Sequence, residues 1–590
     1  MIVKMKKLLM LALKSDRDAA LNKLRDLGVV EVTSDVLADS ADRTRDTALL
    51  NALDMIIGSL SSRKVKNSAA ATAPENAEDL QCFALEAFAE EERLARELDL
   101  LKKEYAIAEP WGEYDPAEIE ALRSKNIFVC LCEGNEDQFA LCQEEFAEKA
   151  NVIKLSVMQG VCRFAVVAFE SLDGENLPTA QVPERKLSAI LQDIGKIEVQ
   201  QELLNGKFDA LALRLDDLKN IRGKVASGIE LLSARDGLTD CGEVVALRGY
   251  VPVHETGKLS AAAQENAWAV IFSDPEVGEA VPVLLEPPRW VKPIMPLFQF
   301  LGIAPGYDEF DMSPGMLIFF SIFFSMIIND AGYGLIMFAA SIVASVLLHK
   351  NRKAAMPCRL ALVLSGCAAV WGICNGAYFG TETHFLQMKF FASGASQTAN
   401  LQLVCFVLAL VHLSLGHCWK SVNASSFMEV VGNLGWVPIL LLDFMVVLSL
   451  LVFPGMAVPT WAFVAGGVGL AMVLIGGIDW RDVVAICNFP FDLIGSFTDT
   501  LSYVRLFAVG MSGTYMAQSF NDMGMQLLDI SPWLLPLTVL VIVLGHLLNV
   551  ALAFMSVLVH GVRLNTLEFS NHAGIRWGGQ AYKPLKNFEQ

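Results

Sequence analysis

A series of long apolar runs in the second half of the chain limits its possible folds more than any other feature. Of the 590 residues, those from 291 to 590 include 13 Lys and Arg and 15 Asp and Glu, whereas residues 1–290 include 33 and 50. Soluble domains carry a charge on about a quarter of their residues. The chain is also too long for one compact domain. These observations predict an acidic soluble half followed by a membrane half. The net charge of −19 argues against a nucleic-acid partner, which would need a basic surface.

The apolar runs predict about eight transmembrane helices, because each run is long enough, or nearly so, to cross a hydrocarbon core of about 30 Å. They lie at about 312–329, 331–349, 359–380, 401–418, 434–453, 460–478, 493–521 and 534–566. The apolar run near the N-terminus is too short for a signal peptide, so we expect a cytoplasmic N-terminus. Eight spans then place the C-terminus in the cytoplasm as well. The distribution of basic residues agrees, with a basic loop after the second span (Lys350, Arg352, Lys353, Arg359) and a basic tail (Arg576, Lys583, Lys586).

The soluble half reads as two small α/β lobes. Residues 2–13, 16–27 and 29–32 have a strand–helix–strand pattern, and residues 243–251, 257–266 and 268–273 repeat it. We expect these pieces, within 1–40 and 240–285, to form one lobe. A second, distal lobe is expected at 120–180, from strands at 126–132, 151–157 and 162–170 and a helix at 135–149.

A heptad pattern predicts a coiled coil between the lobes. Steps of three and four residues from Ile190 to Leu232 give an almost entirely apolar seam. Its partner is expected in helices at 42–66 and 83–106, interrupted by an Ala-rich stretch at 67–77, so that the hairpin uses residues 42–110 and 185–235. An ordinary helical bundle is the alternative. This half contains no Walker A loop, GxGxxG or HExxH motif, and we predict no cofactor and no metal site.

Two polar stripes mark the last membrane runs. A charged side chain within the bilayer costs at least about 2.5–3.5 kcal/mol, so its presence suggests a function. Arg505 lies on a face of small and polar residues (Gly495, Thr498, Ser502, Val509, Ser512, Ser519). The last run carries a second stripe (His546, Asn549, Ala553, Ser556, His560, Arg563, Thr566), which could line a water-filled path. Polar packing inside a helix bundle is the alternative for both stripes.

Several acidic residues accompany these runs. Asp330, between Asn329 and a Gly-rich segment, suggests either a helix cap or ion handling. Asp443 is a lone acid within an apolar run. Asp499 and Glu568 are expected near the ends of spans, in contact with solvent.

Four segments resemble the membrane-embedded stator subunit of V-type (A/V-type) rotary ATPases, called subunit a in eukaryotes and subunit I in bacteria and archaea. They are residues 324–334 (FSMIINDAGYG), 371–380 (WGICNGAYFG), 501–510 (LSYVRLFAVG) and 559–569 (VHGVRLNTLEF), and the ending 578–585 (GGQAYKPL) fits as well. The family usually has Gly at the position of Asn329, and its acidic-Asp-Pro-Thr entry to the first span appears here as EFDMSP at 309–314. The length suits the bacterial form.

The resemblance implies an α+β cytoplasmic half (1–290), an all-α polytopic membrane domain (291–570) and a cytoplasmic tail (571–590). It implies a subunit that is not catalytic alone, that forms two ion half-channels against a rotating proteolipid ring, and that couples H⁺ or Na⁺ movement to ATP chemistry on other subunits. Arg505 would be the essential cation and Arg563 its helper. The expected half-channel lining is His546, Asn549, Ser556, His560, Ser502, Ser512, Asp330 and Glu568.

The same resemblance implies peripheral-stalk subunits of the E/G type and a central-stalk subunit of the d/C type as partners, together with the lipid bilayer of a bacterial cell membrane. Two other functions fit a soluble half joined to a membrane half. A stand-alone secondary transporter with a regulatory domain would favour inverted repeats and broken helices, and no such repeat is evident. A membrane scaffold that binds partners through its coiled coil would not need Arg505 or Arg563.

Overall fold

The computed structural model describes residues 1–33, 40–63, 73–113, 115–147, 149–158, 160–170, 177–178, 180, 182–276, 278–349, 351–383, 386–391, 395–478 and 480–587. Parts of the predicted lobes and coiled coil (34–39, 64–72 and 171–176) and Lys350 of the predicted basic loop lie outside these residues. The chain separates into two compact units. Unit 1 comprises Met1–Ala20, Val29–Thr33 and Thr239–Leu585, and unit 2 comprises Leu21–Gly28, Ser34–Leu238 and Lys586–Gln590.

Unit 1 contains an antiparallel five-stranded sheet that joins both ends of the soluble half. Its strands are β1 (Met5–Leu13), β2 (Glu31–Thr33), β6 (Thr239–Cys241), β7 (Val244–Pro252) and β8 (Ala269–Ser273). They are ordered β2-β7-β1-β8, with β6 on β7. The helix α1 (Arg17–Leu27) follows β1, and α8 (Thr256–Glu265) precedes β8. The alternating burial of β1 is typical of a strand with one apolar face.

Unit 2 is a long helical hairpin. Its helices are α2 (Ala41–Ser61), α3 (Ala77–Ala108), α6 (Leu187–Leu213) and α7 (Leu215–Asp236), and α3 packs on α6 while α2 packs on α7. The heptad positions Ile197, Leu204, Phe208 and Leu218 are buried in one apolar cluster with Leu53 of α2 and Leu80 of α3. The long helix is interrupted at Arg214, where α6 ends and α7 begins.

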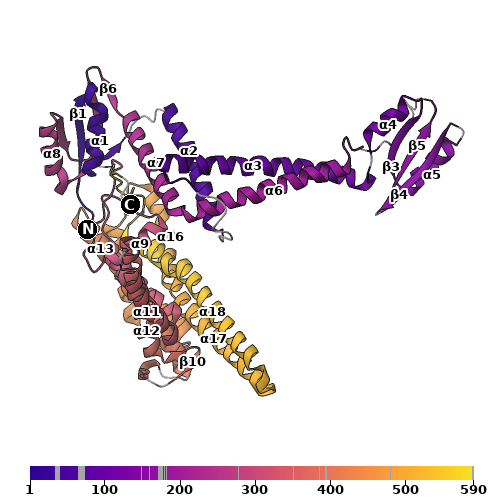
Figure 1. Cartoon of the computed structure of the whole chain (residues 1–590). Coiled ribbons are helices and arrows are strands. Elements are labelled where there is room, and N and C mark those ends of the chain that lie inside the picture. Colours follow the sequence, from indigo (N-terminus) through magenta and orange to yellow (C-terminus); the bar gives the residue numbers. More distant parts are fainter. Residues whose placement is uncertain are drawn as a thin grey trace. The chain divides into compact units, whose positions relative to one another are not determined.

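A small sheet lies at the far end of α3 and α6 within unit 2 (Figure 1). It consists of β3 (Phe128–Gly134), β4 (Ala150–Met158) and β5 (Val161–Ala168), in the antiparallel order β3-β5-β4. The short helices α4 (Pro116–Arg123) and α5 (Glu136–Glu145) accompany it. Phe139 of α5 makes an edge contact with Phe164 of β5, with ring centroids 5.3 Å apart.

The remainder of unit 1 is almost entirely helical. After α9 (Met295–Leu301) come α10 (Ser313–Ile328), α11 (Ala331–Leu347), α12 (Arg352–Asn375), the strands β9 (Ala377–Tyr378) and β10 (Thr381–Glu382), α13 (Ala395–Val422), α14 (Phe427–Val447), α15 (Thr460–Gly476), α16 (Val483–Ser502), α17 (Val504–Ile530), α18 (Leu535–Ser556) and α19 (Ser570–Ala573). Three π-helical segments interrupt this series, at Leu448–Val452, Val557–Gly561 and Leu564–Phe569.

The mostly helical fold with small sheets is confirmed, but the count of eight transmembrane helices is not. Among the described residues, four helical stretches are long and apolar enough to cross a membrane: Ala354–Asn375, Gln397–Val422, Phe427–Val452 and Pro532–Ala573. Three predicted spans form shorter apolar helices, α10, α11 and α15. The predicted run at 493–521 is divided between α16 and α17, because the helix is interrupted at Tyr503.

The helix α10 forms the centre of the bundle, and it packs against α12, α17 and α18. Phe323 is fully buried and belongs to one apolar cluster with Tyr503, Leu506 and Leu564. Apart from one stripe around the exposed Ile318, the residues of α10 are buried, as expected for a helix in the interior of a bundle. The position of α10 therefore determines how closely the last helices approach one another.

The C-terminal tail runs along the five-stranded sheet inside unit 1. The Leu585 N–H donates to the Val30 carbonyl at 2.9 Å, and the Tyr582 hydroxyl donates to the Val29 carbonyl at 2.6 Å. The Lys583 N–H donates to the Glu31 carboxylate at 2.7 Å. Burial raises the pKa of Glu31, and this hydrogen bond offsets the shift only in part. The tail thus connects the end of the last membrane helix to the soluble sheet.

Close backbone contact joins α14 and α15. A Cβ atom on Gly469 would lie 2.5 Å from the Gly435 carbonyl oxygen, and one on Gly476 would lie 2.2 Å from the Met428 carbonyl oxygen. Small residues allow membrane helices to approach this closely and to gain van der Waals contact. On the same helix, a Cβ on Gly467 would meet nothing within 4 Å.

We therefore expect Gly469→Val to destabilise the protein by about 1–3 kcal/mol or more, because the added methyl groups would push α14 and α15 apart. The matched variant Gly467→Val adds the same atoms to open space and should change stability by less than about 0.5 kcal/mol. The measurement is the thermal unfolding midpoint in detergent. Equal midpoints for the two variants would contradict the close packing described here.

Candidate functional site

Arg505 lies in the first turn of α17, immediately after the interruption at Tyr503. Its Nε donates to the Ser502 carbonyl at 3.1 Å, one of the carbonyls that a helix end leaves without an intrahelical partner. A helix N-terminus already carries partial positive charge, so a guanidinium there needs a counter-ion. The side chain is 26% exposed, so it is only partly enclosed by its own chain.

Glu568 supplies that counter-ion. Its Oε1 lies 2.8 Å from Nη2 of Arg505 and 3.3 Å from Nε of Arg563. The Glu568 side chain is 4% exposed, whereas that of Arg563 is 49% exposed. The structure thus brings together three of the predicted site residues, Arg505, Arg563 and Glu568. The expectation that Glu568 lies in solvent at the end of a span is wrong, because it is buried between two guanidinium groups.

The π-helical segment Leu564–Phe569 explains this placement. At 3.6 residues per turn, residues five apart lie about 140° from each other around an α-helix. A π-helical turn pairs residue i with residue i+5, so it brings Arg563 and Glu568 to the same side. The predicted stripe assumed a regular α-helix to Thr566, and it therefore did not link Arg563 with Glu568.

His546 and Asn549 lie in a separate polar network. The Tyr333 hydroxyl lies 2.5 Å from Nδ1 of His546, and Asn549 Nδ2 donates to the same hydroxyl at 3.2 Å and to the Gly513 carbonyl at 2.9 Å. Nε2 of His546 lies 3.0 Å from Oδ1 of Asn521. The Asn521 carbonyl oxygen can accept from Nε2, and the Tyr333 hydroxyl can donate to Nδ1 or accept from it. These contacts form a hydrogen-bonded chain across α11, α17 and α18.

Asp330 caps α11. Its Oδ1 accepts from the Tyr333 N–H at 3.1 Å, and its Oδ2 accepts from the Gly380 N–H at 2.9 Å. The cap interpretation is confirmed, while a role in ion handling stays a prediction. The preceding Asn329 ends α10 with a φ of +49°. That backbone region favours Gly or Asn, which explains how Asn replaces the Gly expected at this position.

The other predicted lining residues make only local contacts. The Ser502 hydroxyl donates to the Thr498 carbonyl at 3.0 Å and the Ser512 hydroxyl to the Val509 carbonyl at 2.8 Å. Ser512 is exposed, while Ser502, Ser556 and His560 are half-buried. Nδ1 of His560 has no hydrogen-bond partner within the described part of the chain. The structure does not join these four residues into one network.

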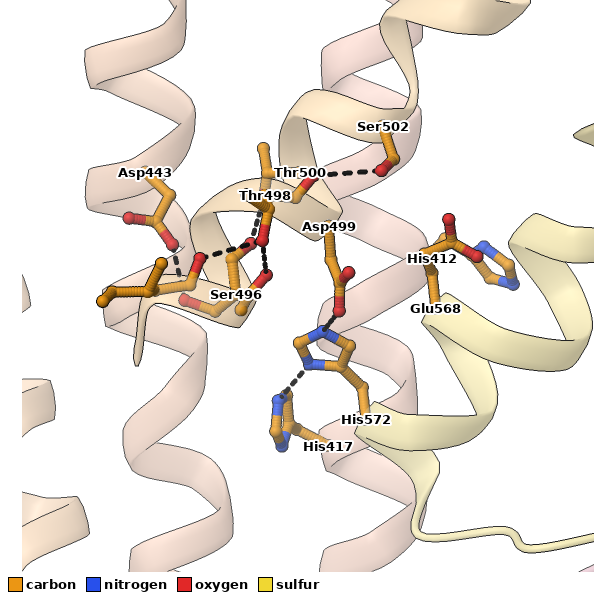
Figure 2. Close-up of polar contacts among 12 residues, drawn as sticks. His412, His417, Asp443, Ser496, Thr498, Asp499, Thr500, Ser502, Glu568 and His572 are labelled. Atoms are coloured by element: carbon orange, nitrogen blue, oxygen red, sulfur yellow. Dashed lines mark hydrogen bonds and ion pairs between the residues drawn. The ribbon is translucent and has the colours of Figure 1, made fainter. Parts of the chain in front are cut away.

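A second polar cluster was missed in the sequence. Figure 2 shows the row formed by Asp499, His572 and His417, with His572 Nε2 3.1 Å from Asp499 Oδ2 and its Nδ1 2.7 Å from His417 Nε2. Asp499 is therefore paired rather than free in solvent, contrary to expectation. Two imidazoles and a carboxylate joined in this way could pass a proton along the row. The row borders a pocket of about 480 Å³, which Lys420 and Asp492 also line.

Two further polar pairs lie near this cluster. Nδ1 of His412 lies 2.7 Å from the Tyr503 hydroxyl, and its ring stacks on Phe569 at 4.2 Å. The Ser496 hydroxyl donates to Asp443 at 2.9 Å. His412 and His417 lie in an apolar run, and this rare placement was the signal available in the sequence. Their partners lie on other helices, and the periodicity of residues within one helix cannot identify contacts between helices.

Metal binding has no evident site in the described parts of the chain. No group of three or more His, Cys, Asp and Glu side chains there is arranged to hold a metal ion. The chemistry that the site residues can support is electrostatic, through two guanidiniums and one carboxylate, and protonic, through the hydrogen-bonded imidazoles.

Full-length relatives carry one subunit name. The chain is 28% identical over a 630-residue alignment to V-type ATP synthase subunit I 1 of Treponema pallidum, which covers 99% of this chain and 100% of the relative. It is 27% identical over 626 residues to V-type ATP synthase subunit I of Borreliella burgdorferi, with 100% of both chains covered. The chain is a homologue of V-type ATP synthase subunit I. The resemblance predicted from the four sequence segments is confirmed.

Comparison with solved structures gives a match of low similarity. The crystal structure of the cytoplasmic N-terminal domain of subunit I, homolog of subunit a, of V-ATPase covers 45% of this chain and 100% of that domain at 16% identity, with a TM-score of 0.21. A TM-score of this size does not establish a common fold. No protein-family model matches the chain.

The cap at Asp330 generates a stability prediction. Asp330→Ala removes the acceptors of two buried N–H groups, so we expect a loss of about 1–3 kcal/mol in the free energy of unfolding. Asp330→Asn retains one side-chain acceptor oxygen and should lose less. The thermal unfolding midpoint in detergent distinguishes them, and an unchanged midpoint for Asp330→Ala would contradict the capping role.

Proposed function

We propose that this chain is the membrane stator subunit of a V-type rotary ATPase, and that it forms two ion half-channels against a rotating proteolipid ring. The observation that carries this proposal is Arg505, a permanent charge in the first turn of α17, partly exposed and paired with a buried carboxylate. The full-length homology to ATP synthase subunit I supports it. ATP chemistry would reside on other subunits.

Arg505 can act on a carboxylate carried past it by a ring subunit. A guanidinium stays charged at every physiological pH, and it favours the ionised form of a nearby carboxylate. The approaching carboxylate would therefore release its H⁺ or Na⁺ beside Arg505 and accept another ion after passing it. The same positive charge repels a cation that would otherwise cross directly. Arg563 would assist from the last helix.

An exposed stripe of α17 supports the ring contact. Ala508, Ser512, Tyr515 and Ser519 are exposed and follow Arg505 at steps of three and four residues, so they lie on its face of the helix. Small residues permit close approach by another helix. We propose that the ring passes along this face.

The half-channels would be lined by polar side chains on either side of Arg505. The network of Tyr333, His546 and Asn549, together with Asp330, offers one set of donors and acceptors. Ser502, Ser512, Ser556, His560 and Glu568 offer another, nearer to Arg505. A chain of hydrogen-bonding groups through a membrane bundle is typical of ion pathways.

The proposed topology has eight spans between 312 and 566, with both termini in the cytoplasm of a bacterial cell. In this arrangement 1–290 is the cytoplasmic domain, 291–570 the membrane domain and 571–590 the tail. The two lobes and the coiled coil would bind peripheral-stalk subunits of the E/G type and approach a central-stalk subunit of the d/C type. The alternative is a secondary transporter, which would move ions as the purified chain alone.

Substitution of the central cation tests the proposal. In the assembled complex, we expect Arg505→Ala and Arg505→Lys to abolish ATP-driven ion transport, because neither supplies a guanidinium at the same position. Proton or Na⁺ uptake by inverted membrane vesicles measures this, with co-purification of the ring as the control for assembly. Undiminished transport by an assembled Arg505→Ala complex would refute the proposed function.

A further inference from the structure

The ion pairs around Arg505 leave one feature of the proposed function unexplained. Transport requires Arg505 to meet a carboxylate of the ring, yet its Nη2 is already 2.8 Å from Glu568 in this chain. Glu568 also lies 3.3 Å from Arg563. An incoming carboxylate therefore meets a guanidinium that already has a partner. It must either share the guanidinium with Glu568 or displace Glu568 from it.

The cluster has a definite formal charge. Two guanidiniums and one carboxylate give +2 − 1 = +1, and the neighbouring acid Asp499 is occupied by His572 at 3.1 Å. Glu568 is buried, while both arginines are partly exposed. Its second oxygen, Oε2, has no hydrogen-bond partner in the described part of the chain. Glu568 thus compensates part of the positive charge of the two arginines from the protein interior, while both arginine side chains stay partly exposed.

Backbone geometry indicates that this arrangement is built into the last helix. Arg563 and Glu568 are five residues apart, and the π-helical segment Leu564–Phe569 brings them to one side. The next residue, Phe569, is fully buried and stacks on His412. Packing therefore holds Glu568 in place, whereas the partly exposed side chains of Arg505 and Arg563 have room to move.

We infer that Glu568 is a positioning residue that sets the charge of the arginine cluster at +1 and acts as the internal partner that a ring carboxylate displaces from Arg505. This inference rests on the proposed function. At a charge of +1 the incoming carboxylate is attracted and can also leave, because Glu568 takes its place beside Arg505. At +2 the carboxylate is held too firmly, and at zero it is not drawn in.

The test changes charge while it preserves shape, in the assembled complex in native membrane vesicles. Glu568→Gln gives a cluster charge of +2, Arg563→Gln gives zero, and the double variant restores +1. We expect each single variant to lose at least about tenfold in ATP-driven ion transport. The double variant should recover part of that loss, because it restores the charge of +1 but lacks the internal partner that replaces the ring carboxylate. Asp522→Asn removes an exposed negative charge from α17 and should leave transport unchanged.

Each outcome decides the inference. Normal transport in Glu568→Gln would overturn it. So would a double variant no better than the single variants, or an assembly defect in Glu568→Gln that Arg563→Gln does not reverse, because a purely structural role predicts both results. Transport that survives Arg505→Ala would instead refute the proposed function itself, so the two failures can be told apart.

Discussion

A buried carboxylate between two guanidinium groups is the interaction on which this membrane domain depends. Charged side chains are expensive in a bilayer, and an unpaired charge left inside costs about 3–5 kcal/mol. Glu568 offsets the charge of Arg505 and Arg563 inside the bundle, since all three share one ion-pair cluster. The packing of α10, α17 and the last helix keeps the three residues within reach of one another.

Irregular backbone places these charges. The helix is interrupted at Tyr503, two residues before Arg505, and the last helix widens into π-helical turns around Glu568. At membrane depth, a backbone group without its regular partner must find another inside the protein. The Ser502 carbonyl finds Nε of Arg505. The interruption at Tyr503 thus has a local compensation, and the two departures together bring Arg505 and Glu568 from separate helices into contact.

The polar networks divide the interior of the bundle into separate regions. Tyr333, His546 and Asn549 connect three helices through one hydroxyl, while His417 and His572 connect two others beside a polar pocket. Both networks hold buried donors and acceptors in defined positions, which a bundle of purely apolar helices could not do. The stator role proposed here requires such fixed polar groups on both sides of Arg505.

The sequence by itself determined the family resemblance and the heptad seam, and it predicted a soluble and a membrane half with Arg505 as the exceptional charge. These follow from composition, local periodicity and short motifs, all of which are readable along one chain segment. Tertiary structure decided that Glu568 is buried, that Tyr333 joins His546 to Asn549, and that His417 pairs with His572. Those contacts join helices that are distant in sequence. The placement of Glu568 depends in addition on a π-helical turn that no regular period of 3.6 residues can anticipate.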